Sequence, residues 1–171
     1  CTSCQVDIMD YSESYPQFKE KNAQIVLVLQ SSVEIMRAQT TAENPPFDIV
    51  CDPTMSLYPI YDLKAAGSKE ELIDKNDPAS MARLMYKREK AAANGLTHGE
   101  YEGEELQLPG LFVLDKEMNV LHAHRAKTIT DMPTAEDMLE IVMKTDEDLQ
   151  GKVFAVKLVD YDGKHMIAEQ I

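Results

Sequence analysis

The sequence predicts an α/β fold in which a mixed sheet is flanked by helices. Two short apolar runs, Ile25–Leu29 and Phe47–Cys51, have the length of buried strands and alternate with helical segments. Two further runs, Leu111–Leu114 and Val120–His124, are separated by a polar segment that suits a hairpin turn. Alternating α and β followed by a hairpin and a last helix is typical of a sheet with helices on both faces. We therefore expect these four runs to be strands of one sheet.

The segment after Cys4 is expected to be a helix that Pro16 kinks or shortens. Its apolar residues recur at helical spacing, so they should form one buried face; they are Ile8, Tyr11, Tyr15 and Phe18. Ser31 or Ser32 can cap a second helix after the first strand, because a serine hydroxyl accepts from an open backbone N–H.

The middle of the chain is expected to be largely helical. Asp52–Pro53 predicts a helix start, with aspartate as the cap and proline in the first turn. Residues 68–94 predict one or two helices, broken at Asn76–Pro78 and ended at Asn94–Gly95, which form a helical insertion before the late hairpin. The last helix should begin at Thr134–Asp137, which resembles a capping box.

The composition changes near the C-terminus. Val153–Val159 and Met166–Ile171 flank Asp160–Gly163, which contains an Asp-Gly turn signal. We therefore divide the chain into a main domain over residues 1–148 and a C-terminal β-hairpin extension over residues 149–171.

The overall charge excludes some classes of partner. A formal net charge of −13 argues against nucleic acid, since phosphate contacts need clustered Lys and Arg, and against anionic membrane surfaces. No apolar run approaches the roughly 20 residues that cross a bilayer. The count of three cysteines does not indicate a disulfide framework, so we expect a reducing, cytoplasmic setting.

The candidate reactive centre is the pair Cys1 and Cys4, which has C-x-x-C spacing at the start of the first helix. Open N–H groups and the helix dipole favour a thiolate at such a position, and this offset lets two sulfurs meet in a disulfide. Three other interpretations stay open. The pair can be half of a zinc site, two inert helix cysteines, or, for Cys1, the lipidated first residue of a mature bacterial lipoprotein.

Other residues carry weaker signals. Pro109 precedes an apolar strand, where proline is ordinarily a strand-edge residue. Cys51 ends a buried run and is expected to be a small core residue. His98 lies in the loop before Pro109 and can approach the cysteines. His122 and His124 alternate along a strand, so they share one face, and solvent-facing histidines are a simpler interpretation than a metal pair. We expect no metal and no bound cofactor.

Four runs resemble the alkyl hydroperoxide reductase and thiol-specific antioxidant superfamily, most closely its peroxiredoxin-like branch. The runs are Cys1–Gln5, Ile25–Ser31, Pro46–Pro53 and Gln107–Asp115, and the resemblance covers about residues 1–146. It implies a thioredoxin-like fold whose first strand lies upstream of Cys1 or is missing. It also implies a cis peptide bond before Pro109, with this proline facing the cysteines and the substrate.

The resemblance implies thiol redox chemistry, either peroxide reduction or dithiol–disulfide exchange, with a thioredoxin-type reductant. A peroxiredoxin-type motif places the attacking thiol at Cys4, whereas a thioredoxin-type motif places it at Cys1, and both assignments stay open. The family's peroxide-polarising arginine is replaced at about its place by Pro109, and Arg125 is a candidate substitute. A non-catalytic thioredoxin-fold interaction module is the alternative function. A homodimer is compatible with the sequence, which does not determine the oligomeric state.

Overall fold

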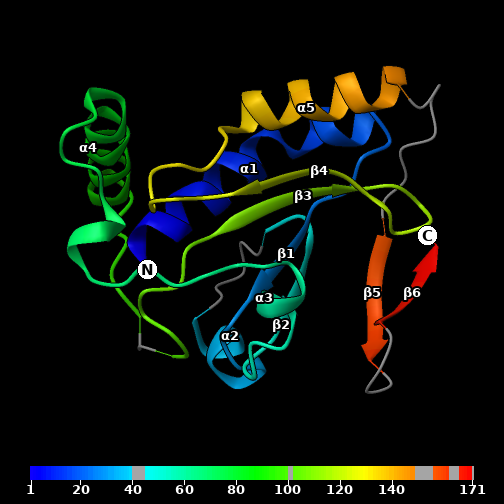
Figure 1. Cartoon of the computed structure of the whole chain (residues 1–171), viewed down its shortest axis with the longest axis horizontal. Helices are drawn as coiled ribbons and strands as arrows, with labels where there is room; N and C mark the ends of the chain where they lie inside the picture. The colour runs from blue at the N-terminus through cyan, green and yellow to red at the C-terminus, as the bar shows by residue number, and fades with distance from the viewer. Residues whose placement is uncertain (40–44, 100–101, 149–155, 162–165, 171) are drawn as a thin grey trace.

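The computed structural model describes residues 1–39, 45–99, 102–148, 156–161 and 166–170 (Figure 1). Helices and strands alternate through the first part of the chain, as expected. The elements in chain order are α1 (Thr2–Glu20), β1 (Val26–Leu29), α2 (Val33–Gln39), β2 (Asp48–Cys51), α3 (Leu57–Ile60), a 3₁₀ turn (Glu70–Leu72), α4 (Pro78–Ala93), β3 (Gly110–Leu114), β4 (Val120–Arg125), α5 (Ala135–Asp148), β5 (Val156–Tyr161) and β6 (Met166–Gln170).

The four expected strands are all present, but they do not form one sheet. β1 and β2 are parallel, with Val26 opposite Asp48, and β3 and β4 are an antiparallel hairpin, with Gly110 opposite Arg125. Each pair is a separate two-stranded sheet among the described residues, so the expectation of a single sheet is wrong. The fold is mixed α/β, and the part of the chain that the structure describes does not confirm a thioredoxin-type sheet.

The segment that leads into β3 pairs with a different part of the chain. The amide of Leu108 donates to the carbonyl of Lys64 at 3.2 Å, and the amide of Ala66 donates to the carbonyl of Leu106 at 2.8 Å. The hydrogen-bonding groups before β3 are therefore paired with the chain that follows α3. The two strand pairs meet through side chains instead, since Leu27 of β1 packs against the core that contains Leu111.

The C-terminal hairpin is present as β5 and β6, which pair antiparallel with Val156 opposite Gln170. Its proposed turn at Asp160–Gly163 falls partly outside the described residues. The boundary between residues 148 and 149 stays a prediction.

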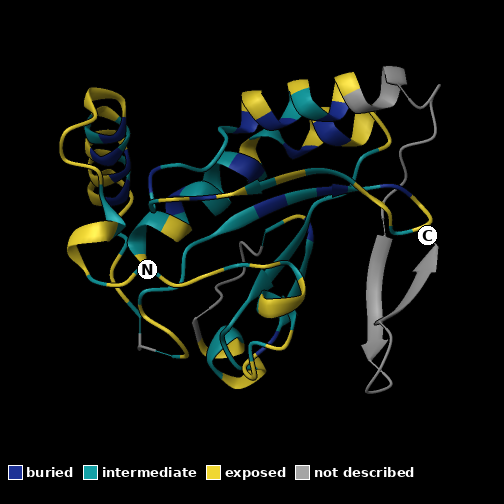
Figure 2. Cartoon of the chain, viewed as in Figure 1, coloured by how far each residue is buried: buried dark blue, intermediate teal, exposed yellow. Residues whose placement is uncertain are grey.

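Helix α1 is longer than expected, because it continues through Pro16 to Glu20. Proline removes one helical hydrogen bond, but burial on both sides of it holds the helix together. Tyr15 is 8% exposed and Phe18 is 1% exposed. The Tyr15 ring also packs edge-on against Phe47, with ring centroids 5.5 Å apart. Helices α1 and α5 lie along the same side of the β3–β4 hairpin, and their buried residues face it (Figures 1 and 2).

The helix caps follow the sequence closely, with one exception. Thr134 and Asp137 form the expected capping box, since each backbone N–H donates to the other side chain at 2.9–3.1 Å. Asp77 caps α4, with Pro78 in its first turn. Asp52, however, does not begin a helix at Pro53. Its carboxylate instead accepts from the loop before α3, so that helix begins only at Leu57.

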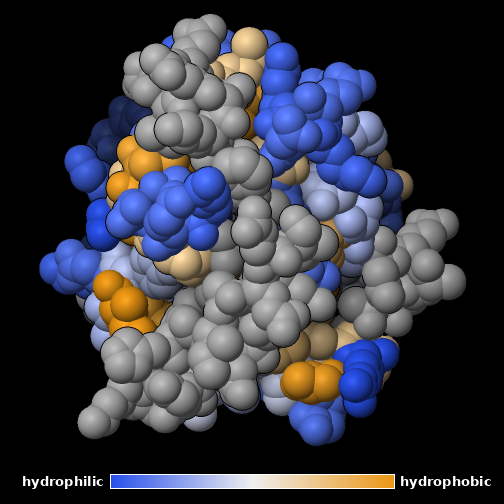
Figure 3. Space-filling view, turned by 90° about the vertical axis from the view of Figure 1, so that its right-hand side faces the viewer, coloured by the Kyte–Doolittle hydropathy of each residue, from blue (hydrophilic) through white to orange (hydrophobic). Residues whose placement is uncertain are grey.

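Outside the grey residues, one face of the molecule is mostly hydrophilic (Figure 3). On the face shown in Figure 3, apolar groups outside the grey residues are small and separated by hydrophilic ones. Among the described residues, no helix has both the length and the apolar character needed to span a bilayer.

Asp52 gives a test of the loop that leads to α3. Its buried carboxylate accepts from Thr54 Oγ1, Ser56 N, Ser56 Oγ and Leu57 N at 2.9–3.1 Å. Burial acts to raise the pKa of Asp52, but these hydrogen bonds outweigh it and lower the pKa below 3.8. Asp52→Ala should cost about 2–3 kcal/mol in urea unfolding at pH 7.

The pH dependence of the unfolding free energy tests whether the ionised Asp52 carboxylate is the cause. Because the folded pKa is lowered, the stabilisation is present above the unfolded pKa and disappears as the pH falls through the folded pKa. The difference between wild type and Asp52→Ala should therefore shrink below about pH 4. Asp74→Ala, which removes one exposed hydrogen bond, serves as control and should change stability by about 0.5 kcal/mol or less. Equal losses in the two variants would contradict this account.

Candidate thiol site

The cysteine pair lies at the start of α1. Cys1 occupies the N-cap position, and Cys4 lies in the first turn, where the amide of Gln5 donates to the carbonyl of Cys1 at 3.1 Å. Both side chains are exposed, and all three cysteines of the chain are free thiols. The pair is therefore accessible in its reduced form, at the position the sequence predicted.

The electrostatics of Cys4 differ from the expectation. Although its side chain is exposed, it is surrounded by enough protein that desolvation raises its pKa. The amino group of Cys1 lowers this pKa, the carboxylate of Asp7 raises it, and the ammonium of Lys87 lowers it. The helix start alone therefore does not give a thiolate at neutral pH, and nearby charges decide how readily one forms.

Tyr58 connects Cys4 to the parallel strand pair. A negative charge on Cys4 raises the pKa of the Tyr58 hydroxyl. A hydrogen bond between this hydroxyl and the backbone of Gln30, the residue after β1, lowers it. Desolvation, together with the charge of Asp52, raises the pKa of Tyr58 to about 12. Tyr58 is therefore a neutral hydrogen-bond donor at physiological pH. Tyr58 is thus influenced both by Cys4 in the first turn of α1 and by Gln30, the residue that follows β1.

Pro109 does not have the expected geometry. No cis peptide bond occurs in the part of the chain that the structure describes, so the Leu108–Pro109 bond is trans and the expectation of a cis proline is wrong. The flanking backbone is held as an extended strand edge. Leu108 pairs with Lys64, and the Pro109 carbonyl accepts from Ala126 at 3.0 Å. Pro109 thus precedes the open end of the β3–β4 hairpin, where Gly110 pairs with Arg125. In Figure 1 this end of the hairpin lies on the same side as the start of α1.

Cys51 is less buried than expected, since it is half-buried at the end of β2. Desolvation and the carboxylates of Glu102 and Glu34 raise its pKa. This surrounding negative charge disfavours a reactive thiolate at Cys51.

The histidines lie apart from the cysteine pair in their described contacts. His122 and His124 do share a face, as expected, and both line an open depression with Asp131 beside α5. The ring of His124 bonds to the backbone carbonyl of Asp131. His98 bonds to the carbonyl of Gly99 at 2.7 Å. Within the described residues, no group of three or more His, Cys, Asp or Glu side chains is arranged to hold a metal ion.

Arg125 is held at the end of β4. Its Nε donates to the carbonyl of Tyr61 at 2.8 Å, and its guanidinium lies 5.2 Å from the ring centroid of Phe112. These contacts tether the side chain to the segment after α3. Among the described contacts of Arg125 none is with a cysteine, so its role as a substitute for the family arginine stays a prediction.

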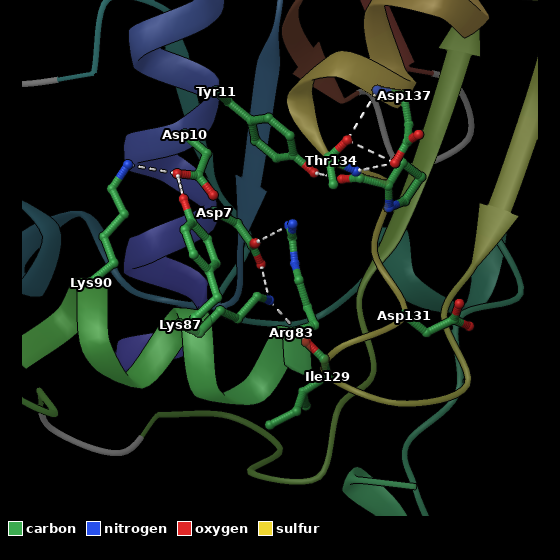
Figure 4. Close-up of polar contacts among 12 residues, drawn as sticks. Asp7, Asp10, Tyr11, Arg83, Lys87, Lys90, Ile129, Asp131, Thr134 and Asp137 are labelled. Carbon is green, nitrogen blue, oxygen red and sulfur yellow. Dashed lines mark hydrogen bonds and ion pairs between the residues drawn. The ribbon is translucent and has the colours of Figure 1, made fainter. Parts of the chain in front are cut away.

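Sequence reasoning missed a buried ion pair beside Cys4. Asp7 of α1 accepts from Lys87 of α4 at 2.7 Å, and the Lys87 side chain is only 1% exposed (Figure 4). A signal was present in the sequence, because Lys87 falls on the same helical stripe as Leu84 and Ala91, which are buried. A lysine on an apolar stripe needs an acidic partner, and Asp7 supplies it.

Comparison with known proteins decides the family. A family model described as "AhpC/TSA antioxidant enzyme" matches residues 10–128. The chain belongs to this family. Membership indicates a peroxide-reducing thiol redox role. The matched region begins after Cys1 and Cys4, so the role of these two thiols rests on their own geometry. Neither a search of curated proteins nor a search of solved structures gave a match.

Thiol labelling tests the site directly. Cys1 and Cys4 are exposed, whereas Cys51 is half-buried among carboxylates. Iodoacetamide at pH 8 should therefore modify Cys1 or Cys4 several-fold faster than Cys51 in the native protein, as followed by mass spectrometry of proteolytic peptides. In urea the three rates should converge. Equal rates in the native state would contradict a special environment for the pair.

Proposed function

We propose that this member of the AhpC/TSA family reduces a peroxide with the thiolate of Cys4 and that Cys1 resolves the oxidised product. The observation that carries the proposal is the presence of two free, exposed cysteines in the first turn of one helix. Cys4 is the better candidate for the attacking thiol, because the positive charge of the buried Lys87 ammonium favours its thiolate form.

The chemistry balances in three steps. The Cys4 thiolate attacks one oxygen of the peroxide, an S–O bond forms as the O–O bond breaks, and the leaving oxygen takes up a proton as an alcohol or water. This oxidises Cys4 to a sulfenic acid. The Cys1 thiol then attacks that sulfur, an S–S bond forms, and water leaves. A dithiol reductant of the thioredoxin type returns two electrons and two protons and restores both thiols.

The local geometry suits the second step. Residues three apart on a helix have Cβ atoms about 5–6 Å apart, which is within reach of disulfide geometry after a small movement. Cys1 is at the cap, outside the regular helix, so its side chain can approach Cys4 without breaking α1. Tyr58, which stays protonated, is a hydrogen-bond donor for the leaving oxygen.

The proposal includes a reducing, cytoplasmic setting, because three free thiols and a reductant of this kind belong to such a compartment. Disulfide exchange through the same pair needs neither an arginine nor a peroxide. It is the outcome that remains if peroxide turnover is absent and a disulfide substrate is reduced.

Peroxide turnover provides the test. With hydrogen peroxide, a thioredoxin system and NADPH, the wild-type protein should consume NADPH in proportion to its concentration. Cys4→Ser should abolish turnover, since the attacking sulfur is lost. Cys1→Ser should still give one fast oxidation per molecule, but it should lose most steady-state turnover because the sulfenic acid is not resolved.

The matched control is Cys51→Ser, which removes the thiol outside the pair and should retain turnover. If wild type is no more active than the Cys1→Ser/Cys4→Ser double variant with a peroxide or with a disulfide substrate, the enzymatic proposal fails. A non-catalytic interaction module would then be the better interpretation. If Cys1→Ser rather than Cys4→Ser abolishes the first oxidation, the two roles are reversed.

A further inference from the structure

A compact charge cluster joins α1 to α4 one helical turn beyond Cys4 (Figure 4). Lys87 donates to Asp7 at 2.7 Å and to the carbonyl of Ile129 at 3.0 Å. Arg83 approaches the second oxygen of Asp7 at 3.4 Å. The side chains of Asp7 and Arg83 are 15% and 19% exposed, so the cluster is largely shielded from solvent.

The cluster has more positive than negative charge at contact distance. Two cations, Lys87 and Arg83, meet one carboxylate, that of Asp7. The Nε atom of Arg83 is buried and makes no hydrogen bond, and two acceptors are in place for the three protons of the Lys87 ammonium. The carboxylate of Asp137 also faces Arg83, but it is exposed and caps α5. An additional anion near this cluster would therefore be stabilised.

Cys4 can supply that anion. It lies three residues before Asp7 on the same helix, so the two side chains project on neighbouring positions of one face. We infer that Lys87 is a positioning residue that stabilises the Cys4 thiolate from α4 and that Asp7 holds its ammonium in place. The effect of Lys87 on peroxide turnover rests on the proposed function, whereas the effect of Lys87 on the ionisation of Cys4 does not.

Each charge that faces Cys4 has a defined direction. Lys87 favours the thiolate, and Asp7 opposes it. The amino group of Cys1 also favours the thiolate and is the same in every variant below. Tyr58 is neutral unless the pH is very high. Lys87 is therefore the side chain that can be changed to remove a favourable charge without removing the anion that opposes it.

The test is the pH dependence of Cys4 alkylation in a Cys1→Ser/Cys51→Ser background, where Cys4 is the single thiol. Lys87→Met keeps the length and the apolar stem of the side chain but removes its charge. The pH at which Cys4 alkylation reaches half of its maximal rate, here called the midpoint, should rise by about one pH unit. Alkylation at pH 7 should then slow about tenfold. The rate at high pH, where the thiol is fully ionised, should be unchanged.

Two matched variants separate charge from packing. Lys90→Met removes another α4 lysine, which binds Asp10 at 2.7 Å instead of Asp7, and should leave the midpoint unchanged. Lys87→Arg retains the charge and should stay near wild type. An unchanged midpoint in Lys87→Met, an equal rise in Lys90→Met, or a rise in Lys87→Arg as large as in Lys87→Met would each overturn the inference.

A second comparison covers the case in which Lys87→Met does not fold. Asp7→Asn/Lys87→Met leaves neither charge of the pair, and its midpoint should lie above that of Asp7→Asn alone. Equal midpoints in that comparison would also overturn the inference. Peroxide turnover is measured separately on the Lys87 single variants, with Cys1 and Cys51 intact. A shifted alkylation midpoint without any peroxide turnover in wild type would refute the proposed function and leave the role of Lys87 intact.

Discussion

The buried ammonium of Lys87 is the constraint on which the arrangement of the N-terminal half depends. An unpaired charge at this depth would cost several kcal/mol, so α1 has to present Asp7 and the loop after β4 has to present the carbonyl of Ile129. One side chain thereby joins three segments that are far apart in the sequence. The neighbouring Lys90, which binds Asp10, repeats the connection between α1 and α4 one turn further along.

The Asp7–Lys87 pair explains how the exposed thiol of Cys4 can have a pKa that depends on neighbouring charges. Helix starts are usually credited with lowering a cysteine pKa, yet here the surrounding protein raises that of Cys4. The thiol is therefore in a balance between desolvation and Asp7 on one side and the amino group of Cys1 and Lys87 on the other. A centre of this kind is not reactive by default, because its nucleophilicity depends on how firmly a second helix is docked.

The sequence predicted local structure better than long-range pairing. Caps such as Thr134 with Asp137 depend on residues a few positions apart, and strand runs depend on composition, so both could be predicted. The predictions of a single sheet and of a cis bond before Pro109 were wrong because both depend on contacts between distant segments, which local sequence patterns do not determine. The Asp7–Lys87 pair was missed for a related reason, since its two members are 80 positions apart. Position within the helix predicted where the thiols lie but not their charge environment.

The bridge between Ala65 and Gln107 has a consequence for how this protein can vary. It closes the chain between these residues into a loop whose two ends are side by side, and α4 lies within that loop. Insertions on either side of α4 should leave both strand pairs intact, because the ends of the loop stay joined and Lys87 keeps its contact with Asp7. Since α4 carries Lys87, an insertion that shifts α4 would change the acidity of Cys4 while the strands stay the same. The reactivity of the site would then evolve through a segment that contributes no strand and no cysteine.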